Sequence, residues 1–227
     1  ITLKNSNGGT GGGIQLAYQG PDQTTAPTPG GLNPIANMAT VGVTALKNVT
    51  GGLVHTLTNT ITVPNQAGPT NTTLETSGFD AISNGAMTVG DNGNLIFASA
   101  TSHSFIQAGP VTLGSNAGLS SAAQAVTVPM ATTLTPANVL ITGSVTLAGD
   151  ANLNADSVGV LTITGAIDDG PDFFGITKNS GAGTVTLGGT AANTFDAAFN
   201  VSHGVLLLDK PAGVNAIGAG GLNLDTS

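Results

Sequence analysis

The densest group of residues that could do chemistry is an acidic loop in the last third of the chain. Asp168, Asp169 and Asp172 stand together in the run Asp-Asp-Gly-Pro-Asp, and Phe173 and Phe174 follow directly. Carboxylate oxygens are preferred ligands of Ca²⁺, so these three aspartates are candidate Ca²⁺ ligands. The alternating Asp-x-Asp-x-Asp-Gly spacing of a calcium loop is absent, which favours a solvated corner loop instead. Apart from this Ca²⁺ hypothesis, we predict no cofactor.

The two aromatic residues beside this loop are the second candidate for a binding role. An exposed Phe173-Phe174 pair could contact a carbohydrate or a protein partner. The alternative is that one ring fills the interior of the fold while the other packs under the loop. The candidate ligand-binding residues are therefore Asp168, Asp169, Asp172, Phe173 and Phe174.

A catalytic role for this region requires more than these acids. Asn154-x-Asp156, Asp168-Asp169 and Ser202-His203-Gly204 resemble, in order, the Asn-x-Asp, Asp-Asp and Gly-His-Gly motifs of polygalacturonases. Hydrolysis of a glycosidic bond requires two carboxylates that flank the bond. Polygalacturonases also hold the acidic sugar with a later Arg-x-Lys motif, whereas this chain has no arginine and only Lys210 follows. Such short fragments match by chance, so we predict no enzyme and keep polysaccharide binding or cleavage as the alternative.

The three histidines are not spaced like metal ligands. His55, His103 and His203 lie 48 and 100 residues apart. Isolated surface or turn positions are therefore the expectation for all three.

Composition excludes several classes of protein. Only 7% of the 227 residues are charged, lysine plus arginine total 4, and the net charge is −8. This chain offers no basic surface to a phosphate backbone, which excludes nucleic-acid binding. No apolar run approaches the roughly 20 residues of a membrane span, and the longest, Val205-Leu206-Leu207-Leu208, suits a buried strand. Without cysteine, neither disulfides nor thiolate metal sites can hold the fold.

The elements that must position these residues are short strands. An apolar–polar–apolar triplet recurs along the chain, usually with threonine in the middle, and this alternation predicts a strand with one face buried. The triplets are Ile1-Thr2-Leu3, Ile61-Thr62-Val63, Met87-Thr88-Val89, Val111-Thr112-Leu113, Val126-Thr127-Val128, Val145-Thr146-Leu147, Leu161-Thr162-Ile163, Val185-Thr186-Leu187, Val205-Leu206-Leu207 and Leu222-Asn223-Leu224. From Ile61 onward they begin around 20 residues apart, which is typical of a solenoid. We therefore predict an all-β fold, a β-helix (solenoid) with irregular coils of about 20 residues.

Glycine and proline mark the connections between these strands. Gly114, Gly143, Gly165 and Gly188-Gly189 flank strands and suit tight corners that need positive φ. Asp91-Asn92-Gly93-Asn94 predicts a tight turn. Residues 17–39 hold four prolines around Gly30-Gly31, and proline breaks sheet ladders. We interpret 17–39 as a long loop or a junction between two stacks, or as a segment that docks on a neighbouring molecule.

The C-terminal part of the chain carries a longer pattern. It runs Gly175-Ile176-Thr177-Lys178-Asn179-Ser180-Gly181-Ala182-Gly183-Thr184-Val185-Thr186-Leu187-Gly188-Gly189, and continues through Ala192–Phe195, His203–Leu208 and Gly218–Leu224. Residues 175–224 resemble the autotransporter-associated β-strand repeat, also called the passenger-associated transport repeat. Phe195 stands where that family usually has Tyr, and Asp196-Ala197-Ala198 replaces its Gly-rich turn. Residues 1–170 share the strand pattern but not the motif.

The resemblance implies a right-handed parallel β-helix in a large exported bacterial surface protein, extracellular or on the cell surface. In that family the repeat is a structural coil without catalytic residues, and the passengers act as adhesins, fibres or stalks. We therefore expect residues 1–227 to form one β-helix segment of a larger structural or adhesive protein. The expected partners are neighbouring subunits of a fibre, through self-association, and a surface glycan or a host or cell surface. A phage-like fibre segment with the same coil is the remaining alternative.

Overall fold

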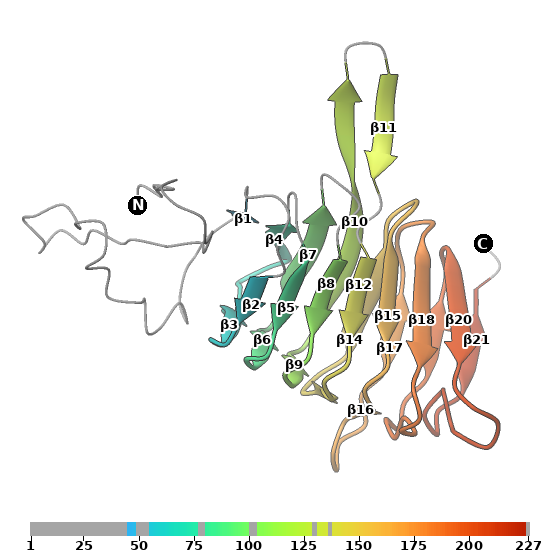
Figure 1. The fold of residues 1–227 in the computed structure, drawn as a ribbon. Helices are drawn as coiled ribbons and strands as arrows, with labels where there is room; N and C mark the ends of the chain where they lie inside the picture. The colour runs from blue at the N-terminus through green and yellow to red at the C-terminus, as the bar shows by residue number, and fades with distance from the viewer. Residues whose placement is uncertain are drawn as a thin grey trace, which may run out of the picture.

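The protein folds as a stack of short parallel strands. The computed structural model describes residues 45–48, 55–76, 80–99, 104–128, 131–135 and 138–225. Within these ranges there is no helix, and the strands form a β-solenoid of about 6 turns with roughly 24 residues per turn (Figure 1). The predicted all-β parallel β-helix is confirmed. Residues 17–39, His103 and the triplet Ile1-Thr2-Leu3 lie outside the described residues.

Three sheets run along the solenoid, and we call them A, B and C in chain order. Sheet A contains, in order, β1 (Ala45–Asn48), β4 (Thr70–Thr76), β7 (Gly93–Ser99), β10 (Ala117–Val128), β14 (Ala151–Ala155), β17 (Ile176–Lys178), β19 (Phe199–Val201) and β21 (Leu222–Leu224). Sheet B contains β2 (His55–Leu57), β5 (Ala81–Ser83), β8 (Ser104–Gln107), β12 (Asn138–Ile141), β15 (Val160–Ile163), β18 (Thr184–Gly188) and β20 (Val205–Asp209). Sheet C contains β3 (Ile61–Val63), β6 (Met87–Val89), β9 (Val111–Leu113), β13 (Val145–Leu147) and β16 (Ile167–Asp168). The chain passes from A to B to C in each turn up to β16, and the later turns cross the third side without a described strand.

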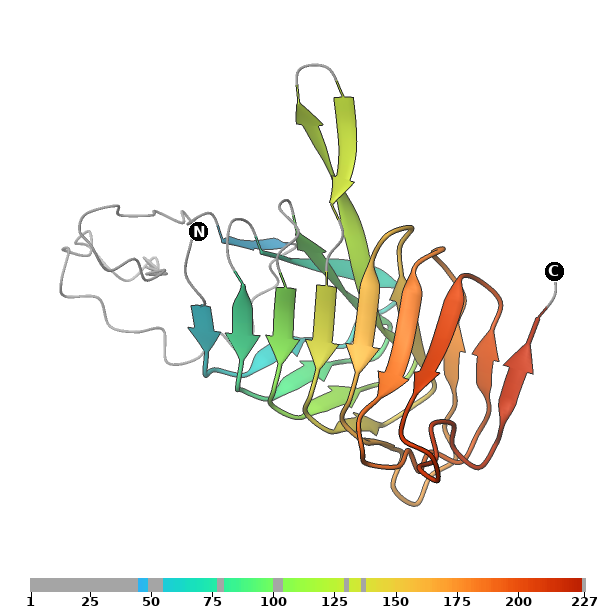
Figure 2. The ribbon, with the colours of Figure 1, turned by 45° about the vertical axis from the view of Figure 1, so that its right-hand side comes forward.

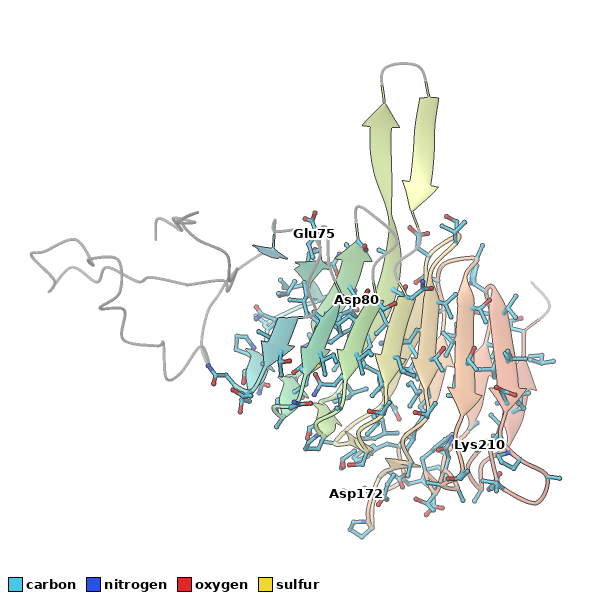
Figure 3. All side chains as sticks on the ribbon, in the orientation of Figure 1. Glu75, Asp80, Asp172 and Lys210 are labelled. Carbon is cyan, nitrogen blue, oxygen red and sulfur yellow. The ribbon has the colours of Figure 1, made fainter. Side chains whose placement is uncertain are left out.

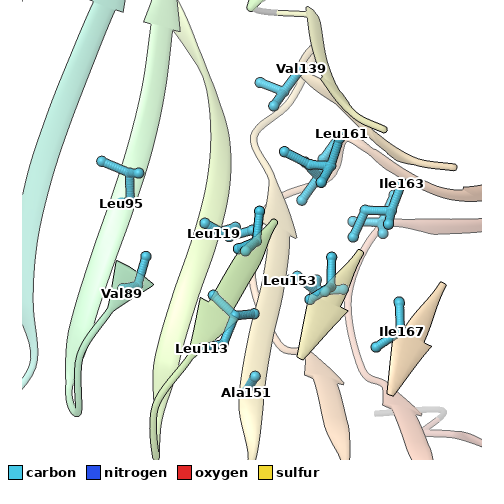
Figure 4. Packing of buried hydrophobic residues seen from close by; sticks show 14 of the residues in the cluster. Val89, Leu95, Leu113, Leu119, Val139, Ala151, Leu153, Leu161, Ile163 and Ile167 are labelled. Atoms are coloured by element: carbon cyan, nitrogen blue, oxygen red, sulfur yellow. The ribbon is translucent and has the colours of Figure 1, made fainter. Parts of the chain in front are cut away.

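The triplets that begin at Met87, Val111, Val145 and Leu161 place their two apolar residues inside the coil and the threonine outside, as predicted, whereas Val205-Leu206-Leu207 is reversed. In β9, Val111 and Leu113 are buried and Thr112 is partly exposed. The inward residues of successive turns form one continuous apolar core, part of which is seen in Figure 4. Phe195 and Phe199, which occupy core positions of the C-terminal pattern, are fully buried. Burial of apolar surface stabilises by roughly 25 cal/mol per Å², so this core is the main stabilising element.

The triplets do not mark successive turns of one sheet. Those beginning at Ile61, Met87, Val111 and Val145 lie in sheet C, those at Leu161, Val185 and Val205 lie in sheet B, and the one at Leu222 lies in sheet A. Their uneven spacing of about 20 residues therefore mixes different sides of the coil, and a true turn is longer. The assignment of Val126-Thr127-Val128 to the coil is wrong. The second half of β10 pairs antiparallel with β11 (Ala131–Thr135) in a hairpin that projects from the stack (Figures 1 and 2).

Glycine is required at the corner between sheets B and C by close packing of the turns. Gly109, Gly143 and Gly165 occupy this corner in successive turns, and a Cβ on either of the last two would overlap the carbonyl oxygen of the glycine one turn earlier. None of the three has positive φ, and neither have Gly114 and Gly188, so the predicted reason is wrong for Gly114, Gly143, Gly165 and Gly188. It is right for Gly189, where φ is 79°. The predicted turn before β7 is also confirmed, with Asn92 at φ 57°.

The apolar run Val205-Leu206-Leu207-Leu208 forms a strand, but the prediction that it is buried is wrong. Val205, Leu207 and Leu208 are 50%, 49% and 44% exposed. Val205 and Leu207 point outward because they are in register with the outward residues Thr184 and Thr186 of β18. Leu208 continues the inward column of Leu187, and within the described residues β20 has a strand partner on one side alone. Nor do the described residues include a helix long and apolar enough to cross a membrane.

Candidate functional site and outer faces

The acidic loop lies at the corner where sheet C leads to sheet A. Asp168 faces outward at the end of β16, and its Oδ1 accepts a hydrogen bond from the Gly170 amide at 2.6 Å. Asp169 is turned inward and only 2% exposed, and its Oδ2 accepts hydrogen bonds from the amides of Phe174 at 2.9 Å and Asp196 at 3.1 Å. Asp172 is exposed on the projecting loop (Figure 3). The three carboxylates therefore have different surroundings, and the described residues include no group of three His, Cys, Asp or Glu side chains that could hold a metal ion.

The two phenylalanines beside this loop differ in burial. Phe174 packs against the apolar core, and its amide is held by Asp169. Phe173 is 72% exposed. The interpretation as packed rings thus holds for Phe174 alone, and Phe173 is the member of the pair that can meet a ligand.

The residues that resemble polygalacturonase motifs are not brought together. His203 is exposed in the turn from β19 to β20, at the corner between sheets A and B, with its Nδ1 3.3 Å from the Ser202 hydroxyl. Asp168 and Asp169 lie at the corner between C and A. Asn154 is 8% exposed, and its Oδ1 accepts hydrogen bonds from two backbone amides of the next turn, 3.1 Å and 3.0 Å away. His55 lies in β2, remote in the stack from His203.

Carboxylates at the corners bind the backbone of the following turn. The Oδ1 atoms of Asp80, Asp91 and Asp150 each accept a hydrogen bond of 2.8 Å from a backbone amide of that turn. The donors are the amides of Ser104, Ser115 and Gly175. Hydrogen bonds to charged groups contribute about 1.5–3 kcal/mol each. Sequence analysis missed this role, although its signal is an Asp followed by the bonded residue 24 or 25 positions later.

Two lysines hold corner loops through backbone carbonyls. Lys178 is fully buried, and its Nζ donates hydrogen bonds to the carbonyls of Ser180 at 3.1 Å and Gly181 at 2.8 Å. Burial lowers the pKa of Lys178, because it penalises the charged form. Lys210 donates in the same manner to the carbonyls of Gly188 and Ala191, at 2.6 Å and 2.7 Å, and burial lowers its pKa as well. The lysine of the C-terminal pattern is therefore a structural lock on its own turn.

A ladder of asparagine amides follows sheet A and the corner before it. Asn116 donates to Asn92 at 3.1 Å, Asn152 donates to Asn116 at 3.2 Å, and Asn179 donates to Asn152 at 3.1 Å. Each bond joins one turn to the next. The ladder satisfies polar side chains without charge, which explains how a chain with so few charged residues keeps a polar surface.

The outer faces of sheets B and C differ from this ladder. On sheet C, Thr62, Thr88, Thr112 and Thr146 stand in register as outward residues of four successive turns. On sheet B, the corresponding outward column begins with Thr56 and continues with aliphatic residues in the next three turns. Sheet A therefore presents an amide ladder, sheet C presents hydroxyl groups, and sheet B presents a mixture of alkyl and hydroxyl groups.

The chain matches no family model, no curated protein and no solved structure in the comparisons with known proteins. Its function has to be inferred from the contacts of its own side chains.

Proposed function

We propose that this chain is a structural β-solenoid segment, a rigid spacer or fibre element without catalytic activity. The observation that best supports this role is how the acidic side chains are used. Asp80, Asp91 and Asp150 each accept a hydrogen bond from a backbone amide of the next turn. Asp169 accepts two, and the one from the Asp196 amide also joins neighbouring turns. If Asp80, Asp150 or Asp169 left these amides to bind a metal or transfer a proton, partly buried donors would lose their acceptor.

Rigidity follows from the number of ways in which each turn is bound to the next. Parallel strand ladders, corner carboxylates and the asparagine ladder all cross the same boundary between turns. Strands in a sheet lie about 4.8 Å apart, so the described solenoid of about 6 turns spans about 29 Å along its axis. Such a rigid unit can hold the segments at its two ends at a fixed distance and orientation.

We also propose that the segment belongs to an exported bacterial surface protein. The support is the resemblance of residues 175–224 to the autotransporter-associated repeat, in which the coil has a structural role. In this region Lys178 locks a turn, and Phe195 and Phe199 fill the core. Adhesion to a glycan or a cell surface would use exposed corner residues, of which Phe173 is the most exposed large apolar side chain.

Small-angle X-ray scattering together with polysaccharide assays tests this proposal. We expect scattering that fits a rigid stack of about 6 turns, and no release of reducing sugar from a panel that includes polygalacturonate. Asp168→Asn removes an exposed carboxylate without touching the bonds between turns, and is the matched variant for the alternative. Cleavage by the wild type that Asp168→Asn abolishes would show a polysaccharide-degrading enzyme and reject the structural role.

A further inference from the structure

The outer face of sheet B is apolar where a solvated strand would be polar. Ile82, Ile106 and Leu140 are the outward, partly exposed residues of β5, β8 and β12, and they stand in register. The column starts at Thr56 of β2 and continues beyond Leu140 through Thr162, which is partly exposed, and Thr186, which is buried. It ends at Leu207 of β20, which is 49% exposed.

A second column on this face is also free of charge. Asn138, Val160, Thr184 and Val205 are in register on β12, β15, β18 and β20. From β5 to β18, no outward side chain of a sheet B strand is charged. No described strand lies over this face (Figures 1 and 2). This face is therefore uncharged from β5 to β18, and it meets one charged outward residue, the exposed Asp209, on the last strand, β20.

We propose that the sheet B face binds the same face of a second copy, so that two solenoids associate side by side. This inference rests on the proposed structural role and names the partner for it. The chain carries a net charge of −8, and acidic residues such as Asp168 and Asp172 are exposed at the corner between sheets C and A. Two copies would repel each other there, whereas the sheet B strands from β5 to β18 bring no like charges together. The exposed Asp209 lies on the terminal strand β20, so a two-fold axis at the middle strand β12 places the Asp209 residues of the two copies at opposite ends of the contact.

The chemistry of the face favours a second copy over other occupants. An uncharged face gives no complementarity to an acidic or basic partner. It has no aromatic outward residue on which a sugar ring could stack. A second solenoid, in contrast, presents columns with the same spacing of about 4.8 Å, so that side chains of the two faces can interdigitate as in a sandwich of sheets.

The size of the face sets the strength of this pairing. Seven strands span about 29 Å along the axis, and three to five residues span roughly 13 Å across it, which gives roughly 400 Å² of face per copy. This is about half of what a standard stable interface buries on each partner. We therefore expect weak, concentration-dependent dimers, which become stable where several such segments act together.

Sedimentation velocity of the whole chain at increasing concentration tests the proposal. Leu140 lies on β12, the middle strand of sheet B, so a two-fold axis places it opposite its counterpart. We expect Leu140→Lys to weaken association at least about tenfold, because it opposes like charges in an apolar contact. Thr146→Lys is the matched control, because it adds the same charge to the outward position of sheet C in the same turn. This control should associate like the wild type.

A pair of oppositely charged variants at Leu140 tests whether association can be restored, which a folding defect would not allow. Leu140→Glu should fail to associate alone, and its mixture with Leu140→Lys should associate again. Thermal melting by circular dichroism confirms that each variant is folded. Association that survives Leu140→Lys but is lost in Leu224→Lys, at the exposed last strand, would show end-to-end joining and overturn the proposal. A wild type that stays monomeric at millimolar concentration would overturn it too, while scattering that fits a rigid stack of about 6 turns would leave the structural role intact.

Discussion

Replacement of Gly143 by alanine tests how closely the turns of the solenoid stack. A Cβ at this position would lie less than 3.0 Å from the backbone carbonyl of Gly109, one turn earlier, and no side-chain rotation relieves such an overlap. The two turns must separate locally, which strains the hydrogen bond of 3.2 Å from the Gly143 amide to the Gln107 carbonyl. Overpacking costs about 1–3 kcal/mol, and a lost hydrogen bond adds about 1 kcal/mol. We therefore expect the free energy of unfolding to fall by about 3 kcal/mol.

Gly68→Ala is the control, because a Cβ at Gly68 meets nothing within 4 Å and its φ is not positive. It should leave stability unchanged or raise it by up to about 1 kcal/mol, since alanine restricts the unfolded chain. For a chain of this length, 1 kcal/mol shifts Tm by about 2–4 °C. Circular dichroism should therefore show Gly143→Ala melting about 6–12 °C below the wild type. Equal melting temperatures for the two variants would refute the close stacking of this corner.

Three further predictions concern the bonds between and within turns. Asp169→Ala should lower the free energy of unfolding by about 2–3 kcal/mol, because two backbone amides lose their acceptor. Asp168→Ala should cost less than about 1 kcal/mol, since it loses one exposed local bond, and equal losses in urea denaturation would contradict the assignment. Burial lowers the pKa of Lys178 below its ordinary 10.5, so unfolding takes up a proton between the two pKa values. Wild-type stability relative to Lys178→Met should therefore rise as the pH rises from neutral toward 10.5, and a constant difference would show that the ammonium is not desolvated. Asn116→Ala and Asn152→Ala should each lower the free energy of unfolding by about 1 kcal/mol. The double variant should lose less than the sum of the two, because both single variants remove the same hydrogen bond between Asn152 and Asn116. Additive losses in this double-mutant cycle would show that the bond contributes nothing.

Alternation along the chain predicted which residues point inward in many of the strands. The inward positions of Val111 and Leu113 followed from it, because the side-chain period of a strand is two. The core positions of Phe195 and Phe199 were expected from the resemblance to the repeat instead, and both residues are buried. The same pattern could not distinguish Val126-Thr127-Val128, which is in a hairpin. Whether such a strand pairs with the turn before it or with residues 131–135 depends on the tertiary partner and not on its own sequence.

The acidic loop shows a second limit of the sequence. Nothing in the run Asp-Asp-Gly-Pro-Asp indicates that Asp169 is buried while Asp168 is exposed. The difference arises because the amide of Asp196 lies one turn away, 27 residues along the chain, and needs an acceptor. Three carboxylates that are adjacent in sequence are therefore one buried acceptor and two solvated side chains in the structure.

The outward residues of the strands contribute least to folding, and this makes their pattern informative about partners. Sheets B and C have the same parallel geometry, but sheet B departs from the apolar–polar–apolar alternation in β5 and β8, where the inward Ser83 and Gln107 are polar. Sheet C keeps threonine outward in four successive turns. Sheet B places Ile82, Ile106 and Leu140 outward in three successive turns instead. Folding does not require this substitution, since the inward columns already supply the core, and it adds apolar surface exposed to water. An aliphatic column on one face of an otherwise polar solenoid is therefore best explained by a partner that covers it, and the charge-reversal pair at Leu140 tests that explanation directly.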